Sequence, residues 1–202
     1  MAIWEGPGID AWRPWRPEEV ALRLADVAAP WCVVGGWALD LWRGAHLREH
    51  DDLEIAVPRQ YFPLLREALS GFRIFAVGDG EGRPLDPGAE PAPQIHQNWV
   101  LDEEAGAWRV DIFLEPGDAA TWVYRRDPTI SVPRPEMVAV SADGVPYLRP
   151  EGVLLYKAKA RREKDEADFI SAVPHMDPPA RAWLRGMLSR LHPGHPWIER
   201  LA

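Results

Sequence analysis

Apolar residues recur along the chain with two spacings, which predict an α/β part followed by a helical part. Helical spacing predicts five helices, at residues 17–28, 36–43, 59–70, 150–172 and 178–191. Alternating or short continuous apolar runs predict strands, at residues 31–35, 51–57, 72–77, 95–101, 107–114, 120–124 and 136–140. A long loop rich in glycine, proline and acids is expected at 78–93. We therefore predict two domains, an α/β domain at residues 1–145 and a helical region at residues 146–202.

The predicted strand at 51–57, DDLEIAV, places three acids within its first four positions. Side chains of a strand alternate between its faces, so Asp52 and Glu54 share one face, while Asp51 heads the apolar face. The Cα atoms of Asp52 and Glu54 should lie about 7 Å apart. Two such anions repel each other unless a cation lies between them, and hard oxygen ligands suit Mg²⁺. The alternative is an acidic strand edge that faces solvent.

A third acid, Asp111, interrupts the apolar strand at 107–114. Its side chain falls on the face opposite to the apolar residues of this strand, and a buried acid needs a partner. If this strand lies beside 51–57, the three carboxylates converge, as in a two-metal site that activates a hydroxyl and holds phosphate. The alternative partner for Asp111 is an arginine in a salt bridge.

Gly35 and Gly36 join a predicted strand to a predicted helix. Glycine lets the backbone approach a phosphate closely, and a helix N-terminus favours an anion. A tight turn without a ligand is the alternative interpretation of this pair.

Cations gather on one face of the predicted helix at 150–172. At 3.6 residues per turn this face carries Lys157, Arg161, Lys164 and Asp168. Cations in this arrangement suit the β- and γ-phosphates of a nucleotide and the departing pyrophosphate. The alternative is a solvated face with ion pairs along the helix.

Charge and composition narrow the class of protein. The net charge of −8 argues against broad contact with nucleic acid, and it is compatible with a cationic small molecule. No apolar run approaches the length of a membrane span, and the N-terminus lacks the order of a signal peptide. The single cysteine, Cys32, lies in an apolar run and is expected to be buried, which suits a reducing cytoplasm.

Several motifs together resemble the nucleotidyltransferase superfamily, which has the DNA polymerase β-like fold. They are GGWALDLWRGAHLREHDDLEIAV, VDIFLEP, the GVPYL turn at 144–148 and the helical PEGVLLYKAKARREKDEADF. The resemblance is closest to aminoglycoside 2″-adenylyltransferases and lincosamide nucleotidyltransferases, and it spans most of residues 31–170. It implies an α/β (α+β) fold with a mixed β-sheet flanked by helices, followed by a C-terminal helical part.

The resemblance also implies roles for individual residues. Asp52 and Glu54 fall on the metal-binding pair, and Asp111 falls on the third carboxylate, a metal ligand and candidate general base. Gly35 and Gly36 fall on the turn that cradles phosphate. Glu54 departs from the aspartate that is usual in the antibiotic-modifying members. Further nucleotide contacts are expected from Lys157, Lys164 and Arg48, with His50 as a local hydrogen-bonding residue.

The predicted protein is a cytoplasmic, Mg²⁺-dependent nucleotidyltransferase with a two-metal site. It would move a nucleoside monophosphate, AMP from ATP, to a hydroxyl of a small molecule such as an aminoglycoside-like antibiotic. One alternative is a toxin–antitoxin component or a degenerate nucleotide-binding module that acts on a protein partner. Another is an α/β protein whose acids bind Ca²⁺.

Overall fold

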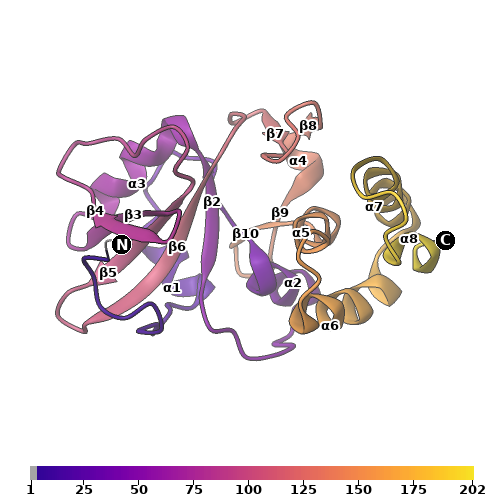
Figure 1. The fold of residues 1–202 in the computed structure, drawn as a ribbon, viewed down its shortest axis with the longest axis horizontal. Helices are drawn as coiled ribbons and strands as arrows, with labels where there is room; N and C mark the ends of the chain where they lie inside the picture. Colours follow the sequence, from indigo (N-terminus) through magenta and orange to yellow (C-terminus); the bar gives the residue numbers. More distant parts are fainter. Residues whose placement is uncertain (1–3) are drawn as a thin grey trace.

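A mixed eight-stranded sheet forms the centre of the molecule, and a computed structural model describes residues 4–202 (Figure 1). The strand order in this sheet is β4-β3-β5-β6-β2-β1-β10-β9. Its strands are β1 (Cys32–Val33), β2 (Glu54–Pro58), β3 (Arg73–Gly78), β4 (Glu81–Pro84), β5 (Gln97–Asp102), β6 (Ala107–Glu115), β9 (Val138–Val140) and β10 (Pro146–Leu148). A separate two-stranded sheet pairs β7 (Thr121–Val123) with β8 (Ser131–Pro133). The β2–β6 and β1–β10 pairs are parallel, and the other pairs are antiparallel.

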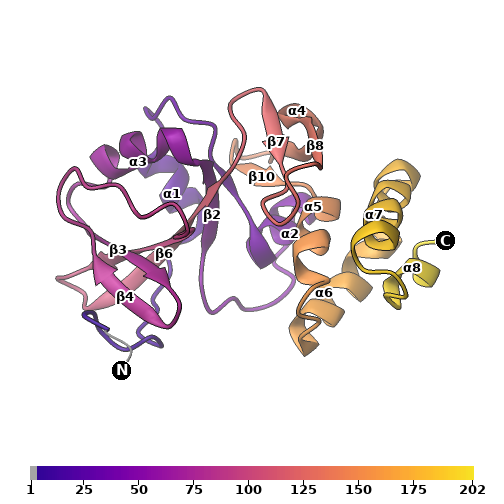
Figure 2. The same cartoon turned by 45° about the horizontal axis from the view of Figure 1, so that its top comes forward.

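Helices flank this sheet, and the C-terminal ones gather at one end of the molecule, as two views show (Figures 1 and 2). The helices are α1 (Pro17–Arg23), α2 (Gly35–Arg43), α3 (Phe62–Ala68), α4 (Arg134–Met137), α5 (Pro150–Lys157), α6 (Glu163–Ala172), α7 (Pro178–Leu191) and α8 (Trp197–Arg200). Two short 3₁₀ helices are η1 (Arg59–Tyr61) and η2 (Val173–His175). Within the described part of the chain, no helix combines the length and apolar character that crossing a bilayer requires.

The alternation predicted for the two central strands is confirmed. Leu53, Ile55 and Val57 on the β2 side are fully buried, as are Val110 and Ile112 of β6. These side chains belong to one hydrophobic core that also includes residues of α1 and α3. Burying this apolar face leaves the opposite face of β2 and β6 to carry the acids.

Several predicted elements differ from the structure. The helix predicted at 17–28 ends at Arg23, and the strand predicted at 136–140 begins only at Val138, after α4. The helix predicted at 150–172 is two helices, α5 and α6, because the chain turns between them and Arg161 takes a left-handed φ of 47°. The turn is held by Asp165, a fully buried residue that accepts hydrogen bonds from the backbone and side chain of Arg162. The predicted loop at 78–93 contains β4, which pairs with β3.

The strand predicted at 51–57 begins only at Glu54, and this changes the position of Asp51. The prediction that Asp51 heads the buried face is wrong, because its side chain is 87% exposed. Residues 146–148 form β10 and extend the sheet, so the helices begin at Pro150. A division into domains at residues 1–145 and 146–202 stays a prediction.

Trp197 anchors the last helix, α8, to α6. Its ring stacks on Phe169 with centroids 4.1 Å apart, and its indole Nε1 donates a hydrogen bond of 2.7 Å to Glu166. The side chain is fully buried although only five residues of the sequence follow it. The C-terminal helices are therefore packed as part of the folded structure.

We predict that Trp197→Ala lowers the free energy of unfolding by about 3–5 kcal/mol, because it leaves a cavity beside Phe169. Ile170→Ala is the matched control, since Ile170 lies on the same helix as Phe169 and is 55% exposed. The control should change stability by about 0.5 kcal/mol or less. Urea denaturation measures both variants, and equal losses would contradict the packing described.

Candidate active site

The pairing of β2 with β6 brings the predicted acids to one face of the sheet. The two strands are parallel, and Glu54 is the direct Cα partner of Asp111. Asp52 lies two residues before Glu54 and is partly exposed. The prediction that the two acid-bearing strands are neighbours is confirmed.

Asp111 is a buried acid with one oxygen satisfied and one free. The residue is 3% exposed, and its Oδ2 accepts a hydrogen bond of 2.7 Å from the side-chain amide of Gln97 on β5. Its Oδ1 is buried and lacks a partner within the described residues. Burial raises the pKa of Asp111 to about 8, although the hydrogen bond from Gln97 favours the charged form. No arginine of residues 4–202 forms an ion pair with Asp111, so the salt-bridge alternative does not describe this structure.

Glu54 carries the second raised pKa of this face. Burial is the largest cause, and repulsion from Asp52 adds to it, so that the pKa of Glu54 rises to about 7. The nearby charges of Lys157 and Arg162 act in the opposite direction. Two adjacent carboxyl groups that hold protons near neutral pH indicate a site that lacks a counter-charge.

Gly35 makes room for the carboxylate of Glu54. It begins α2 with a left-handed φ of 65°, and a Cβ atom there would lie 1.8 Å from Glu54 Oε2. Gly36 has a different neighbour, because a Cβ on this residue would lie 2.5 Å from both Arg48 and His50. The glycine pair is therefore required by two separate close approaches.

The donor set of the three acids fits Mg²⁺, because it offers only oxygen ligands and includes the unpartnered Oδ1 of Asp111. The carboxylate oxygens of Asp52, Glu54 and Asp111 do not all lie within 4.8 Å of one another. Within residues 4–202, the one group of three potential ligands whose donor atoms all lie within 4.8 Å of one another consists of Asp40, His46 and His50.

A cavity of about 290 Å³ opens beside the acid face, between the sheet and α5. Of the predicted site residues, it is lined by Gly35, Glu54 and Lys157, whereas Asp52, Asp111, Gly36, Arg48 and Lys164 lie outside its lining. Three arginines that the sequence analysis missed also line it, Arg125, Arg126 and Arg162. The arginine pair follows a strand-like run, in WVYRRD, and this position at a strand end was the available signal.

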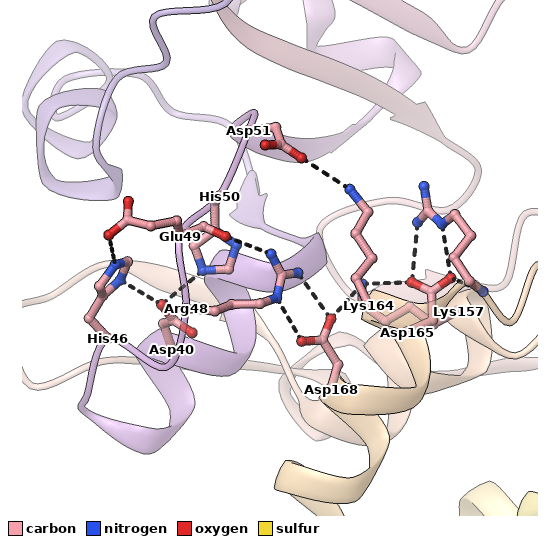
Figure 3. Close-up of polar contacts among 11 residues, drawn as sticks. Asp40, His46, Arg48, Glu49, His50, Asp51, Lys157, Lys164, Asp165 and Asp168 are labelled. Carbon is pink, nitrogen blue, oxygen red and sulfur yellow. Dashed lines mark hydrogen bonds and ion pairs between the residues drawn. The ribbon is translucent and has the colours of Figure 1, made fainter.

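Two of the predicted phosphate-binding cations, Lys157 and Arg48, are paired with acids of α6 (Figure 3). Lys157 Nζ lies 2.9 Å from Asp168 Oδ2 and 3.1 Å from Asp165 Oδ1. Arg48 donates two hydrogen bonds, of 2.9 and 3.1 Å, to the carboxylate of Asp168. Lys164 of α6 is partly exposed, and its Nζ lies 3.5 Å from Asp51 Oδ2.

These pairings decide the charge of Asp168. Burial opposes ionisation of its carboxyl group, but hydrogen bonds from Arg48 and Lys157 outweigh burial and lower the pKa of Asp168. The guanidinium of Arg48 gains in turn, since the hydrogen bonds to Asp168 raise its pKa. Asp168 therefore stays ionised and joins the residues before β2 to the C-terminal helices.

Comparison with solved structures defines the class of this fold. The lincosamide antibiotic adenylyltransferase LnuA, solved with lincomycin bound, has a TM-score of 0.51 and 18% identity over 75% of this chain and 90% of its own. The antibiotic-resistance factor ANT(2″)-Ia has a TM-score of 0.49 and 16% identity over 91% of this chain and 85% of its own. A nucleotidyltransferase-like protein from Paracoccidioides brasiliensis gives 0.48 and 16% over 91% and 88%. The likeness to LnuA supports the nucleotidyltransferase fold predicted for the chain.

One protein-family model matches part of the sequence. The model of the aminoglycoside-2″-adenylyltransferase family matches residues 18–84, which include Gly35, Asp52 and Glu54 but not Asp111. A search of curated protein sequences finds no match. The predicted resemblance to this family is confirmed over residues 18–84.

We predict that stability without divalent cations falls as the pH rises from about 5 to about 9. The raised pKa values of Asp111 and Glu54, about 8 and 7, mean that the folded protein holds protons that the unfolded chain has released above pH ~4. This contribution is complete below pH ~4, falls as the pH rises from there, and is fully lost above pH ~8. Asp111→Asn should reduce the fall in Tm by roughly 4 °C or more.

Thermal unfolding in a chelating buffer at a series of pH values measures this difference. Asp143→Asn is the matched control, because Asp143 is exposed in a turn far along the chain from the acid face. The control should follow the wild-type curve. An Asp111→Asn curve parallel to the wild type would show that Asp111 ionises normally.

Proposed function

We propose that the protein transfers AMP from ATP to a hydroxyl group of a small molecule, with Mg²⁺ as its cofactor. The observation that carries the proposal is the unpartnered, buried oxygen of Asp111 on the same sheet face as Glu54. Beside this face lies a cavity lined by four cations, Arg125, Arg126, Lys157 and Arg162, which suits the phosphates of a nucleotide.

Asp111 is suited to take the proton of the acceptor hydroxyl. Gln97 fixes one carboxylate oxygen, and a cation held by the three acids would keep the carboxyl group ionised, which is the form that accepts a proton. The acceptor oxygen then forms a bond to the α-phosphorus as the bond from that phosphorus to the bridging oxygen of pyrophosphate breaks.

The cationic wall of the cavity is proposed to hold the triphosphate and the departing pyrophosphate. Arg125 and Arg126 follow β7, and Arg162 precedes α6, so cations from two segments face the same space. Asp52, Glu54 and Asp111 would hold Mg²⁺, which supplies compensation of the phosphate charge. Lys157 would exchange a carboxylate partner for phosphate.

The proposed acceptor is a cationic antibiotic of the aminoglycoside class. The family match over residues 18–84 supports this class, and the net charge of −8 favours a cation over an anion. A reducing cytoplasm is the proposed setting, because Cys32 is buried as a free thiol. No specific observation favours a toxin–antitoxin component or a degenerate binding module.

Transfer of label from α-labelled ATP in the presence of Mg²⁺ tests the proposal. The acceptors offered are a panel of aminoglycosides, lincosamides and candidate proteins. The wild type should label an antibiotic, and Asp52→Asn and Asp111→Asn should each lower the rate by about 100-fold or more. Asp143→Asn should keep the wild-type rate.

Calorimetry with ATP and Mg²⁺ separates the possible failures. Absence of binding by the folded wild type would refute the proposal at its first step. Binding without transfer to any antibiotic, but with labelling of a protein, would instead support the module that acts on a protein partner.

We further predict that Gly35→Ala and Gly44→Ala each lose about 1 kcal/mol of stability from the strained backbone. Gly35→Ala should lose more because it also displaces Glu54, and it alone should change nucleotide binding. Both glycines have left-handed φ values, 65° and 62°, which an alanine adopts at a cost. A Cβ at Gly35 forces the carboxylate of Glu54 away, whereas a Cβ at Gly44 meets no atom within 4 Å. Urea denaturation and ATP–Mg²⁺ calorimetry measure the two effects, and equal affinities in the two variants would contradict the role of Gly35.

A further inference from the structure

Three potential metal ligands meet outside the acid face, between α2 and β2 (Figure 3). Asp40 Oδ2 lies 3.0 Å from His46 Nδ1 and 2.9 Å from His50 Nε2. All three donor atoms lie within 4.8 Å of one another. The proposed transfer reaction uses none of these side chains.

The surrounding structure holds two ligands and leaves the third accessible. Asp40 and the side chain of His50 are buried, at 6% and 3% exposure, and the ring of His46 is 43% exposed. Trp37 packs beside both imidazoles, with ring centroids 5.4 Å from His46 and 4.5 Å from His50. The missing Cβ of Gly36 makes room for the ring of His50.

We propose that Asp40, His46 and His50 form a Zn²⁺-binding site, distinct from the acids of the transfer site. Zinc takes nitrogen and carboxylate ligands at about 2.0–2.2 Å in a tetrahedral arrangement, which places neighbouring ligand atoms about 3.3 Å apart. The two Asp40–histidine distances are already close to this value. A water molecule would take the fourth position, on the side that His46 leaves open.

The proton of the His46 imidazole has an acceptor when a metal binds. A neutral imidazole carries one N–H, and the ligand nitrogen must be the bare one. For His46 the N–H then lies on Nε2, which is 3.3 Å from Glu49 Oε1, and a carboxylate behind a ligating histidine is a common outer partner. For His50 the N–H then lies on Nδ1.

Local charge also favours a cation at this point. Asp40 supplies one negative charge to the group, and Glu49 supplies another next to His46. Arg48 is the cation in the same segment, and its charge is compensated by two hydrogen bonds to Asp168. Imidazole nitrogen suits Zn²⁺ and similar transition metals, whereas the oxygen-only acids of the sheet suit Mg²⁺.

A bound ion would fasten the segment that joins α2 to β2. The segment runs from Gly44 to Leu53, and it carries Arg48 and ends beside Asp52. Asp40 holds one end from within α2, and His50 holds the other end close to the acids. The proposed role of the ion is therefore to position this segment.

Titration of the metal-free full-length protein with Zn²⁺, followed by calorimetry and thermal unfolding, tests the site. We expect one equivalent to bind to the wild type and to raise its Tm. His46→Ala should weaken binding by at least 10-fold, and Glu49→Ala should weaken it by less, because the Glu49 side chain is 98% exposed. His46 is partly exposed, so its replacement leaves the fold intact.

Two controls distinguish this site from other ligands on the chain. His175→Ala removes an exposed histidine elsewhere and should bind Zn²⁺ like the wild type. Asp52→Asn should also keep the affinity for Zn²⁺. Co²⁺ serves as a spectroscopic probe, whose tetrahedral visible absorption should appear with the wild type and disappear with His46→Ala.

Failure of the wild type to bind Zn²⁺ would overturn the proposal. Equal affinity in the wild type and His46→Ala would do the same. Loss of Zn²⁺ binding in Asp52→Asn with retention in His46→Ala would place the ion on the sheet acids instead. These outcomes are independent of whether the protein transfers AMP.

Discussion

The parallel register between β2 and β6 is the constraint on which the rest of the site depends. It sets Glu54 directly opposite Asp111, and it turns both carboxyl groups away from the apolar core. A slip of one residue would exchange the faces and place the acids among buried aliphatic side chains. The burial of Leu53, Ile55 and Val57 holds this register, so these residues determine where the carboxyl groups of the site lie.

A second layer of order comes from paired charges between distant segments. Asp168 of α6 receives hydrogen bonds from Arg48, which precedes β2, and contacts Lys157 of α5. Asp165 joins Lys157 to Arg162 across the break between α5 and α6. These buried pairs hold the C-terminal helices against the acid-bearing part of the chain, and removing one partner would leave an uncompensated charge.

The sequence predicted those features that depend on local periodicity. The alternation in 107–114 placed Asp111 on the correct face, and the helix at 178–191 has the bounds of α7. The break between α5 and α6 was missed, because it depends on a buried contact of Asp165 that helical spacing does not encode. The exposure of Asp51 was missed for a similar reason, since the segment at residues 12–15 pairs with Trp108 and Arg109 of β6, where the residues before Glu54 would otherwise pair.

The site could be predicted only in part, because local patterns place the acids but not the contacts between distant segments. The acids Asp52, Glu54 and Asp111 could be assigned from strand patterns. The arginines at 125 and 126 line the cavity only because of tertiary packing, which a local pattern does not encode. The pairing of Lys157 and Arg48 with acids of α6 also joins residues far apart in sequence. Helical spacing placed Lys157 and Asp168 on one face, yet it could not reveal that Arg48 shares the same carboxylate.

The two ion pairs of Lys157 would make ligand binding in the cavity selective, because a ligand must compete with two carboxylates for this lysine. Two carboxylates, of Asp165 and Asp168, already compensate its single charge. A ligand gains from Lys157 only when its own negative charge replaces these carboxylates favourably, so a polyphosphate has an advantage over a weakly charged ligand. In the proposed reaction, the carboxylates would contact the lysine again once the polyphosphate has left. The same pairing would then discriminate among incoming ligands and return Lys157 to its starting contacts.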